Sequence, residues 1–416
     1  MRFDVAVVGA GPAGSIAAHA LSRGGARTCL IDPAASFPRD KACGDLIGPR
    51  GVRLLEEVGI PVPTATSGRD IILVGPTGNQ ARLEWRQGST YADHAIAVPR
   101  TSLDNTLRAA ALDAGAVPVT GRAVGLMGDP EQVEGVRLGD GAKARADFVV
   151  GADGARSTVA SAAGLVDPRQ VLWGFALRFY VQQTVELPYI VAFEPESRRV
   201  FPGYGWLFPS GDGRANLGLG MGTLHERTGA VEVARHLDRF VTGLRRHGLV
   251  DQGVTLTHRR GGWLKMGMAG TRPARGRVLL VGDAAGLVNP LQGEGISQAL
   301  MSGRAAGKAI LGEGDPAARY LGFLSSTFAN FHASAAALQA LTLPRPRVLS
   351  AAVRTLTSPL VARVISDAWA LYWNDLVEGA YPGRARTKAA AIGRLAGALT
   401  VSAGIRRGVE NALDER

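Results

Sequence analysis

Short apolar runs and helical patterns alternate along the first part of the chain. Residues 3–8 read Phe-Asp-Val-Ala-Val-Val, which predicts a buried strand. An Ala-rich helix is predicted from Pro12 to about Leu21, and a second strand at 28–32. The same patterns predict strands at 117–119, 147–150 and 277–281 and a helix over 103–114. Strands alternating with helices in this way predict an α/β fold with a doubly wound parallel sheet.

The middle of the chain has a different pattern. Strand-like alternation dominates 171–221, with turn residues at Pro195, 202–203 and 211–213. This predicts an antiparallel sheet, and the similar alternation of 71–97 is expected to join it. From Gly295 onward the pattern is helical almost to the end.

The turn after the first strand carries a glycine fingerprint. Its first glycine allows the tight turn, the second lets backbone N–H groups approach a pyrophosphate, and the third lets the helix pack on the sheet. The helix N-terminus then faces the phosphate, and the carboxylate that ends the second strand accepts the hydroxyls of an adenosine ribose. The predicted contacts of this Rossmann-like dinucleotide site are Gly9, Gly11, Pro12, Ala13, Gly14 and Asp32.

Two later segments complete the same site if the sheet is doubly wound. Residues 149–157 run from a strand into a turn of small residues, and 278–283 run from a strand into Gly-Asp. The second acid can accept hydrogen bonds from a sugar-alcohol chain, and the helix that starts near 296 directs its amides to the pyrimidine end of a flavin. Three motifs in this order predict FAD. The contacts expected here are Asp153, Gly282, Asp283, Pro290, Gly293, Gly295 and Ile296.

These patterns divide the chain into three predicted domains. The FAD-binding domain is discontinuous, the substrate domain is built on the antiparallel sheet, and the C-terminal region is helical. Their ranges are 1–70, 98–165 and 270–325; 71–97 and 166–269; and 326–416.

Composition limits the partners. The 416 residues carry a net charge of +11, yet the basic residues are scattered, and no segment interleaves aromatics with Lys and Arg as a nucleic-acid reader would. We therefore expect no nucleic acid. A milder basic cluster between 345 and 407 keeps contact with an anionic membrane open. No run of about 20 apolar residues occurs, so we expect a cytoplasmic protein, with peripheral membrane contact as the alternative.

Other chemistries find little support. Two cysteines are too few for a disulfide scaffold and fit a reducing compartment, and the seven histidines show no metal-ligand spacing. Residues 218–222 miss the third glycine of a second dinucleotide fingerprint. The external electron donor is therefore open: a transiently docked NAD(P)H, a reductase partner or a small carrier.

Four motifs carry a resemblance to known enzymes. Gly-Ala-Asp-Gly-Ala-Arg-Ser at 151–157 and Gly-Asp-Ala-Ala-Gly at 282–286 resemble FAD-dependent enzymes with the para-hydroxybenzoate hydroxylase fold. Within that superfamily, residues 37–45 and 202–209 resemble the geranylgeranyl reductase family, which includes bacterial menaquinone side-chain reductases. The resemblance covers roughly residues 3–330.

This resemblance implies roles for particular residues. It places Cys43 and Asp45 near the isoalloxazine ring as catalytic residues. Nearby cations favour a thiolate, and Arg39 and Lys41 are close in sequence. The resemblance also implies a hydrophobic tunnel lined by Tyr204, Trp206 and Phe208. These residues alternate along one predicted strand and so project to one face of it. The flavin contacts that the resemblance adds are Arg39, Lys41, Cys43, Gly44 and Arg100.

Three functional hypotheses follow. The first is an FAD-dependent reductase that adds two hydrogens across isolated C=C bonds of a polyprenyl chain, with Cys43 or a water near Asp45 as the proton source. The alternative is a flavin-dependent monooxygenase, an epoxidase or hydroxylase of a prenylated or aromatic metabolite, which works through a C4a-hydroperoxyflavin. The third is a flavoprotein that only binds lipid or a partner. The fold does not separate these, but the Cys-Gly-Asp and Tyr-Gly-Trp segments favour reduction.

Overall fold

The protein is described from a computed structural model. The described residues are 2–329 except 63–65, 69, 76–77, 84–91, 93, 193–203, 224–225 and 291–292, together with 332, 354, 355, 358 and 361. The predicted helical region 326–416 therefore lies mainly outside the described residues, as do most of the basic residues between 345 and 407. None of the helices in the described part of the chain combines the length and the hydropathy of a membrane span.

A largely parallel sheet carries the predicted nucleotide motifs. Its strands are β1 (Arg2–Val8), β2 (Thr28–Asp32), β8 (Val117–Thr120), β9 (Ala123–Met127), β10 (Gly135–Leu138), β11 (Lys143–Gly151), β17 (Ala274–Arg275) and β18 (Val278–Leu280). They lie in the order β17-β18-β11-β1-β2-β8, and β10 and β9 extend antiparallel from β11. Val8 is in register with Gly151 and Ile31, and Gly151 is in register with Leu280. The carboxyl ends of four strands therefore meet at one edge.

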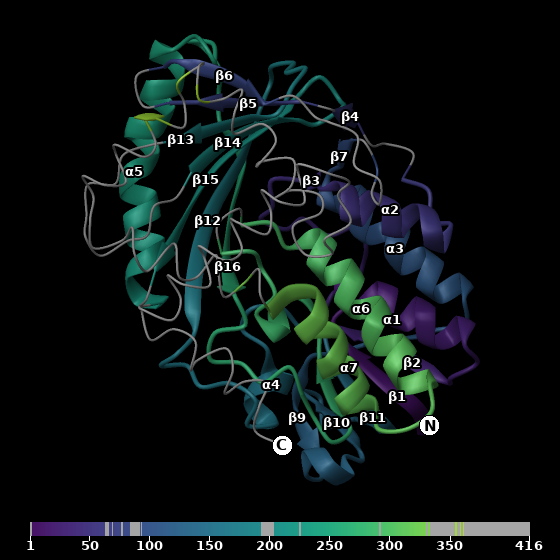
Figure 1. Cartoon of the computed structure of the whole chain (residues 1–416). Helices are drawn as coiled ribbons and strands as arrows, with labels where there is room; N and C mark the ends of the chain where they lie inside the picture. The colour runs from purple at the N-terminus through teal and green to yellow at the C-terminus, as the bar shows by residue number, and fades with distance from the viewer. Residues whose placement is uncertain are drawn as a thin grey trace.

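Helices gather beside this sheet (Figure 1). They are α1 (Pro12–Arg23), α2 (Pro49–Val58), α3 (Arg100–Asp113), α4 (Thr158–Ala162), α6 (Ile296–Leu311) and α7 (Pro316–Leu324), with short turns η1 (Pro130–Gln132), η2 (Gly282–Ala285) and η3 (Ser325–Ala329). Helices α1 and α6 touch through small residues. A Cβ at Gly303 of α6 would lie 2.2 Å from the carbonyl oxygen of Ala13, so only glycine permits this approach.

A seven-stranded sheet forms the second layer. Its strands, in spatial order, are β16 (Thr257–Met266), β12 (Leu172–Val181), β15 (Ala215–Thr223), β14 (Tyr204–Pro209), β13 (Tyr189–Ala192), β5 (Ile71–Val74) and β6 (Gln80–Leu83). Neighbours are antiparallel except β13 and β5, which pair in parallel. The amphipathic helix α5 (Glu226–Arg246) covers one face; Phe240 and Leu244 pack in one core with Leu207 and Leu217.

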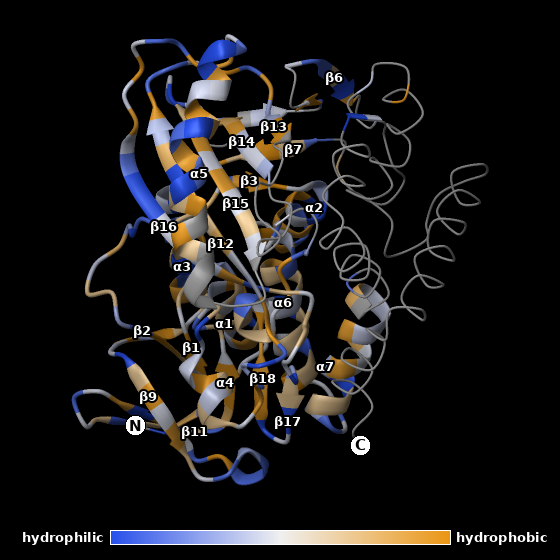
Figure 2. Cartoon of the chain, turned by 90° about the vertical axis from the view of Figure 1, so that its left-hand side faces the viewer, coloured by the Kyte–Doolittle hydropathy of each residue, from blue (hydrophilic) through white to orange (hydrophobic). Residues whose placement is uncertain are grey.

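Hydropathy shows how the two sheets are stabilised. Figure 2 shows β1, β11 and β18 mainly in the hydrophobic colour, whereas α5 alternates between the two colours. The carboxyl-terminal parts of the three strands, 5–8, 149–151 and 278–280, are buried on both faces, as expected for a parallel sheet, while α5 needs only one apolar stripe.

The prediction that 71–97 joins the antiparallel sheet is correct for β5 and β6 and wrong for β7 (Ala95–Ala97). β7 pairs with β3 (Leu46–Ile47) and β4 (Thr66–Gly68) in a separate three-stranded sheet. The reason is the apolar cluster in which Ile47 and Ile96 pack with Leu103 of α3. Helix α5 follows the predicted strands and was not anticipated.

The close contact between α1 and α6 gives a stability prediction. Gly303→Ala should lower the free energy of unfolding by about 1–3 kcal/mol, because its methyl group meets backbone. The same change at Gly322 of α7, where a Cβ meets nothing within 4 Å, should raise stability by about 0.5–1 kcal/mol through helix propensity. Urea unfolding followed by circular dichroism measures both, and equal effects would contradict the packing described.

Candidate active site

Three loops meet at the carboxyl edge of the parallel sheet. They follow β1, β11 and β18 and contain the three predicted motifs. Gly9 has φ 106°, and a Cβ there would lie 2.3 Å from the carbonyl oxygen of Ala152. A Cβ at Gly14 would lie 1.8 Å from the oxygen of Gly9. The glycines therefore allow backbone to pass backbone at the place where the cofactor is predicted.

Two helices begin at this edge without side-chain caps. Gly11 precedes α1 and Gly295 precedes α6, and neither N-cap residue supplies a side-chain hydrogen bond. Amides of the first helical turns lack intrahelical partners and favour an anion. This pair of helix ends fits the pyrophosphate and the flavin pyrimidine of FAD.

The acid predicted for the adenosine ribose is held from several sides. Asp32 accepts hydrogen bonds from the backbone of Ala10 at 2.8 Å, and it pairs with Arg39, whose Nη1 lies 3.0 Å from Asp32 Oδ2. Arg39 Nε also lies 3.6 Å from Asp104, which binds the Arg100 guanidinium at 2.7 and 2.9 Å. Arg39 and Arg100 thus lie on one chain of alternating charges.

The second predicted acid, Asp283, lies among cations. Burial raises the pKa of Asp283, and Lys41, Arg100 and Lys265 act in the opposite direction. Lys41 also lies beside Gly154, whose Cβ position is 3.9 Å from Lys41 Nζ. Lys41 therefore links the second motif loop to the third.

Lys265 at the end of β16 is a site residue that the sequence did not reveal. It is 1% exposed and donates a hydrogen bond to the carbonyl of Ala284 at 2.6 Å. Burial lowers the pKa of Lys265 to about 8, although Asp283 and Asp153 oppose this. Lys265 therefore connects the seven-stranded sheet to the third motif by a hydrogen bond.

The predicted contact Asp153 has a local structural role. Its carboxylate accepts hydrogen bonds from Ser157 Oγ at 2.5 Å and from the amides of Thr158 and Val159 at 2.7 and 3.1 Å. It therefore caps α4 and shapes the second loop.

The other predicted contacts lie on the first and third loops. Gly282 and Gly293 have φ 56° and 65°, a conformation suited to glycine. A Cβ at Gly295 would lie 3.4 Å from Asp283 Oδ1. The helix starts supply Pro12, Ala13 and Ile296, and Pro290 lies beside Gly267.

Asp45 is a fully buried acid of the site. It is 0% exposed and has a left-handed backbone with φ 65°. Its Oδ2 accepts hydrogen bonds from Tyr180 and Asn216, both at 2.6 Å, and its Oδ1 accepts one from the Arg100 amide at 3.2 Å. Burial raises the pKa of Asp45, while Tyr180 and Asn216 oppose the rise.

Asn216 joins this acid to the aromatic strand. Its Nδ2 also donates to the carbonyl of Cys43 at 2.9 Å, and its Oδ1 accepts from Trp206 Nε1 at 2.8 Å. Asn216 is fully buried. One amide side chain therefore fixes Cys43, Asp45 and Trp206 relative to one another.

Arg178 supports the same network from β12. It is fully buried, pairs with Asp40 and donates to the carbonyl of Lys41 at 2.8 Å. The Tyr180 ring lies against Arg178 and Arg214, at 4.4 and 4.5 Å from the two guanidinium carbons. A single arginine inside the apolar strand sequence of β12 was the signal in the sequence for this cluster.

The structure does not support the expectation that Arg39 and Lys41 favour a Cys43 thiolate. Burial raises the pKa of Cys43, and the cation that opposes the rise is Arg100 rather than Arg39 or Lys41. Arg39 is engaged by the two acids described above. Cys43 therefore keeps its proton at neutral pH, and its Sγ accepts a hydrogen bond from the Asp45 amide at 3.3 Å.

Tyr204, Trp206 and Phe208 form a row on one face of β14. Ring centroids lie 6.2 Å apart for the first pair and 6.3 Å for the second. A Cβ at Gly44 would lie 3.1 Å from the Phe208 ring, and one at Gly293 would lie 3.5 Å from the Tyr204 hydroxyl. The row therefore extends from the Cys43 loop to the third motif.

Comparisons with known proteins agree with this geometry. The profile of the FAD binding domain family matches residues 2–312. A menaquinone reductase of Mycolicibacterium smegmatis is 35% identical over 88% of this chain and 93% of its own. A digeranylgeranylglycerophospholipid reductase of Methanopyrus kandleri is 33% identical over 77% of this chain and 84% of its own.

The chain belongs to the geranylgeranyl reductase family of FAD-dependent oxidoreductases. A solved geranylgeranyl bacteriochlorophyll reductase-like structure from Thermoplasma acidophilum shares the fold. Its TM-score is 0.69 at 22% identity, and the match covers 96% of this chain and 99% of that one. The predicted fold class, cofactor and family are confirmed.

The Asp45 network gives a pH-dependent prediction. Because the folded pKa of Asp45 lies above its ordinary 3.8, the wild-type protein loses stability as pH rises through that pKa. Tyr180→Phe removes a hydrogen-bond donor to the carboxylate. It should lower the free energy of unfolding by about 1–3 kcal/mol at neutral pH, and by less below the Asp45 pKa. Urea unfolding at several pH values checks this, with Tyr189→Phe in the same sheet as the control. A cost independent of pH would contradict the role given to Tyr180.

Lys265 gives a second pH prediction with the opposite sign. Its folded pKa of about 8 lies below the ordinary 10.5, so the folded protein holds fewer protons between these values. Stability should therefore rise with pH in that window, by at most about 1.4 kcal/mol per pH unit. Unfolding curves of Lys265→Met should lack the rise, and those of the surface variant Lys308→Met should keep it. A rise that survives in Lys265→Met would refute this assignment.

Proposed function

We propose that the protein reduces isolated C=C bonds in a polyprenyl chain. The observation that carries the proposal is the position of Cys43, on a loop whose Gly44 packs against the aromatic row of β14. The raised pKa of Cys43 is consistent with a thiol that can give up a proton. The names of the two relatives, a reductase of menaquinone and one of a digeranylgeranyl lipid, point to the same substrate class.

The residues of this chain have distinct parts in the reaction. Bound FAD in its reduced form supplies a hydride equivalent to one alkene carbon. Cys43 gives its proton to the other carbon, which completes the addition of two hydrogens, and it regains a proton from water. The Asp45 amide donates a hydrogen bond to Cys43 Sγ and the Asn216 side chain donates one to the Cys43 carbonyl, and together they hold Cys43 in place.

The substrate offers no carbonyl that the protein can polarise, so positioning and exclusion of water must lower the barrier. Tyr204, Trp206 and Phe208 pack in one apolar cluster with Ile71 and Ile190. We propose that the hydrocarbon chain lies against this cluster and that the cofactor contacts predicted above hold FAD at its edge.

We propose further that electrons come from NAD(P)H docked transiently or from a redox partner, because the chain carries no second dinucleotide fingerprint. A polyprenyl substrate resides in lipid, so we also propose peripheral contact with a membrane, to which the basic residues between 345 and 407 contribute.

Turnover without oxygen tests the reaction. Holoenzyme reduced with dithionite under argon should be reoxidised by a detergent-solubilised polyprenyl quinone. After the quinone ring of the product has been reoxidised in air, tandem mass spectrometry should show two added hydrogens in the polyprenyl side chain. Cys43→Ala should bind FAD normally but lower kcat by about 100-fold or more, as for loss of a general acid. Cys29→Ala, which removes a fully buried cysteine of β2, serves as the matched control and should retain activity.

A different result would decide for the alternative. If turnover required oxygen and the product gained an oxygen atom, the protein would be an epoxidase or hydroxylase. If Cys43→Ala kept full activity, reduction would need another proton donor and the part given to Cys43 would be wrong.

A further inference from the structure

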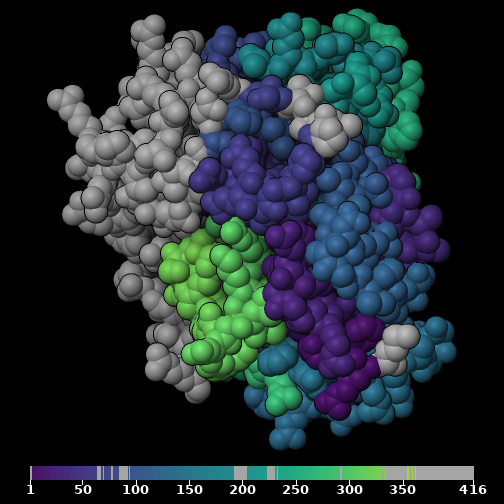
Figure 3. Space-filling model, turned by 90° about the vertical axis from the view of Figure 1, so that its right-hand side faces the viewer, coloured from purple at the N-terminus to yellow at the C-terminus, as the bar shows by residue number. Residues whose placement is uncertain are grey.

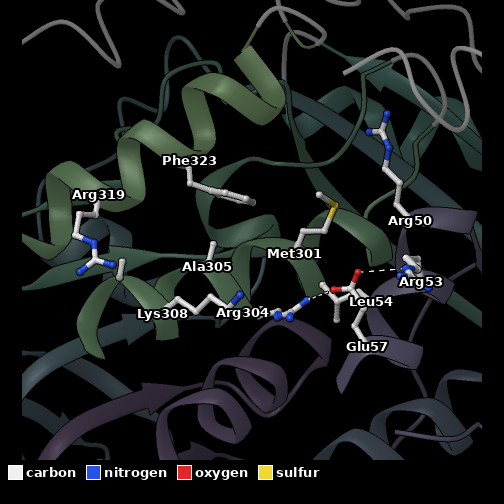
Figure 4. Close-up of a pocket in the computed structure, with 11 residues that line it drawn as sticks. Arg50, Arg53, Leu54, Glu57, Met301, Arg304, Ala305, Lys308, Arg319 and Phe323 are labelled. Atoms are coloured by element: carbon white, nitrogen blue, oxygen red, sulfur yellow. Dashed lines mark hydrogen bonds and ion pairs between the residues drawn. The ribbon is translucent and has the colours of Figure 1, made fainter. Parts of the chain in front are cut away.

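A groove of about 410 Å³ lies between α2, α6 and α7, outside the site described above. Figure 3 shows these helices side by side on one face of the molecule, although α2 is far from α6 and α7 in sequence. Its floor is apolar and its rim is charged (Figure 4). The floor is formed by Leu54, Met301, Ala305, Ala309 and Phe323, and the rim by Arg50, Arg53, Glu57, Arg304, Lys308 and Arg319.

The rim has a large excess of positive charge. Among the described lining residues, four exposed or half-exposed cations face one carboxylate, and a fifth, Arg50, is buried and has a partner of its own. The one carboxylate, Glu57, forms ion pairs with two of these cations, Arg304 at 2.5 Å and Arg53 at 3.2 Å. At the other end, Arg319 donates to the neutral carbonyl of Glu313 at 2.8 Å, and no carboxylate of the described residues pairs with it.

The two kinds of lining restrict the ligand. Inorganic phosphate would use the cations but not the apolar floor, and a neutral isoprenoid would use the floor but not the cations. An anionic amphiphile uses both. The volume is within the usual range of ligand sites and has room for a headgroup and the first part of one chain, but not for a whole diacyl lipid.

We propose that this groove binds an acidic phospholipid at a bilayer surface. The phosphate lies toward Lys308 and Arg319, and the start of an acyl chain lies over Met301 and Phe323. This groove is where the membrane contact proposed above would occur. The proposal rests on that contact and is independent of the proposed reaction. Since α6 begins at the active site and its far end lines the groove, docking here brings the bilayer close to the aromatic row of β14.

Vesicle binding tests the proposal with the full-length holoenzyme. Co-sedimentation with vesicles of phosphatidylglycerol and phosphatidylcholine is compared with phosphatidylcholine alone. The double variant Lys308→Glu/Arg319→Glu should bind the anionic vesicles at least tenfold more weakly, because each cation near such a surface contributes about fivefold. Both side chains are exposed. The flavin spectrum and the thermal midpoint of the variant are compared with those of the wild type to check that it is folded.

A matched control removes the same net charge elsewhere. Arg239→Glu/Arg246→Glu changes two exposed residues of α5, at the opposite edge of the molecule in Figure 1, and should weaken binding less than twofold. Equal losses in both double variants would show a nonspecific charge effect and overturn the groove. Equal binding of wild-type protein to neutral and anionic vesicles would overturn it as well.

Competition separates the lipid from a free phosphate compound. Short-chain dioctanoyl phosphatidylglycerol should displace the protein from vesicles at concentrations at which glycerol 3-phosphate does not. Equal displacement by the two would mean that the groove takes a free phosphate, and the lipid proposal would fail. Anaerobic reduction of the detergent-solubilised quinone should be unchanged in Lys308→Glu/Arg319→Glu, so failure here is distinguishable from failure of the proposed reaction.

Discussion

The buried carboxylate of Asp45 is the constraint on which the site depends. An acid that is 0% exposed is costly to keep charged, so each of its lone pairs must be satisfied. Tyr180 and Asn216 reach it from the seven-stranded sheet, and the Arg100 amide reaches it from α3. The hydrogen bonds that lower this cost therefore join the seven-stranded sheet to the edge of the parallel sheet where FAD is expected, and they position Cys43 between the two.

This arrangement explains why one loop serves two purposes. The segment that ends at Asp45 bears Arg39 and Lys41, which face the acids of the first and third cofactor motifs. It also bears Cys43 and Gly44, which face the aromatic strand. Because the same short segment contacts both layers, the cofactor edge and the aromatic row of β14 lie next to each other. Burial raises the pKa of Cys43, which favours the protonated state that a proton donor requires.

The sequence predicted correctly those features that depend on residues close together in the chain. The strand and glycine fingerprint before α1 and the alternating aromatics of β14 depend on residues near in sequence, and both lie as expected. Contacts between distant strands were not predictable: Asn216 reaches the Cys43 loop only because β15 pairs with both β12 and β14. The thiolate expectation failed for the same reason, since sequence proximity of cations says nothing about burial. β7 was misplaced because its alternation fits either sheet and tertiary packing decides.

The protonation state of Cys43 tests the account most directly. In the Cys29→Ala background, the rate of alkylation by iodoacetamide can be measured against pH for the single remaining cysteine, with protein mass confirming one modification. Burial places the pKa of Cys43 above the ordinary 9.0, so the rate should stay low at neutral pH and rise only above pH 9. A rate already half-maximal near pH 7 would show a thiolate, and the assignment of Cys43 as a proton donor held by the Asp45 network would be wrong.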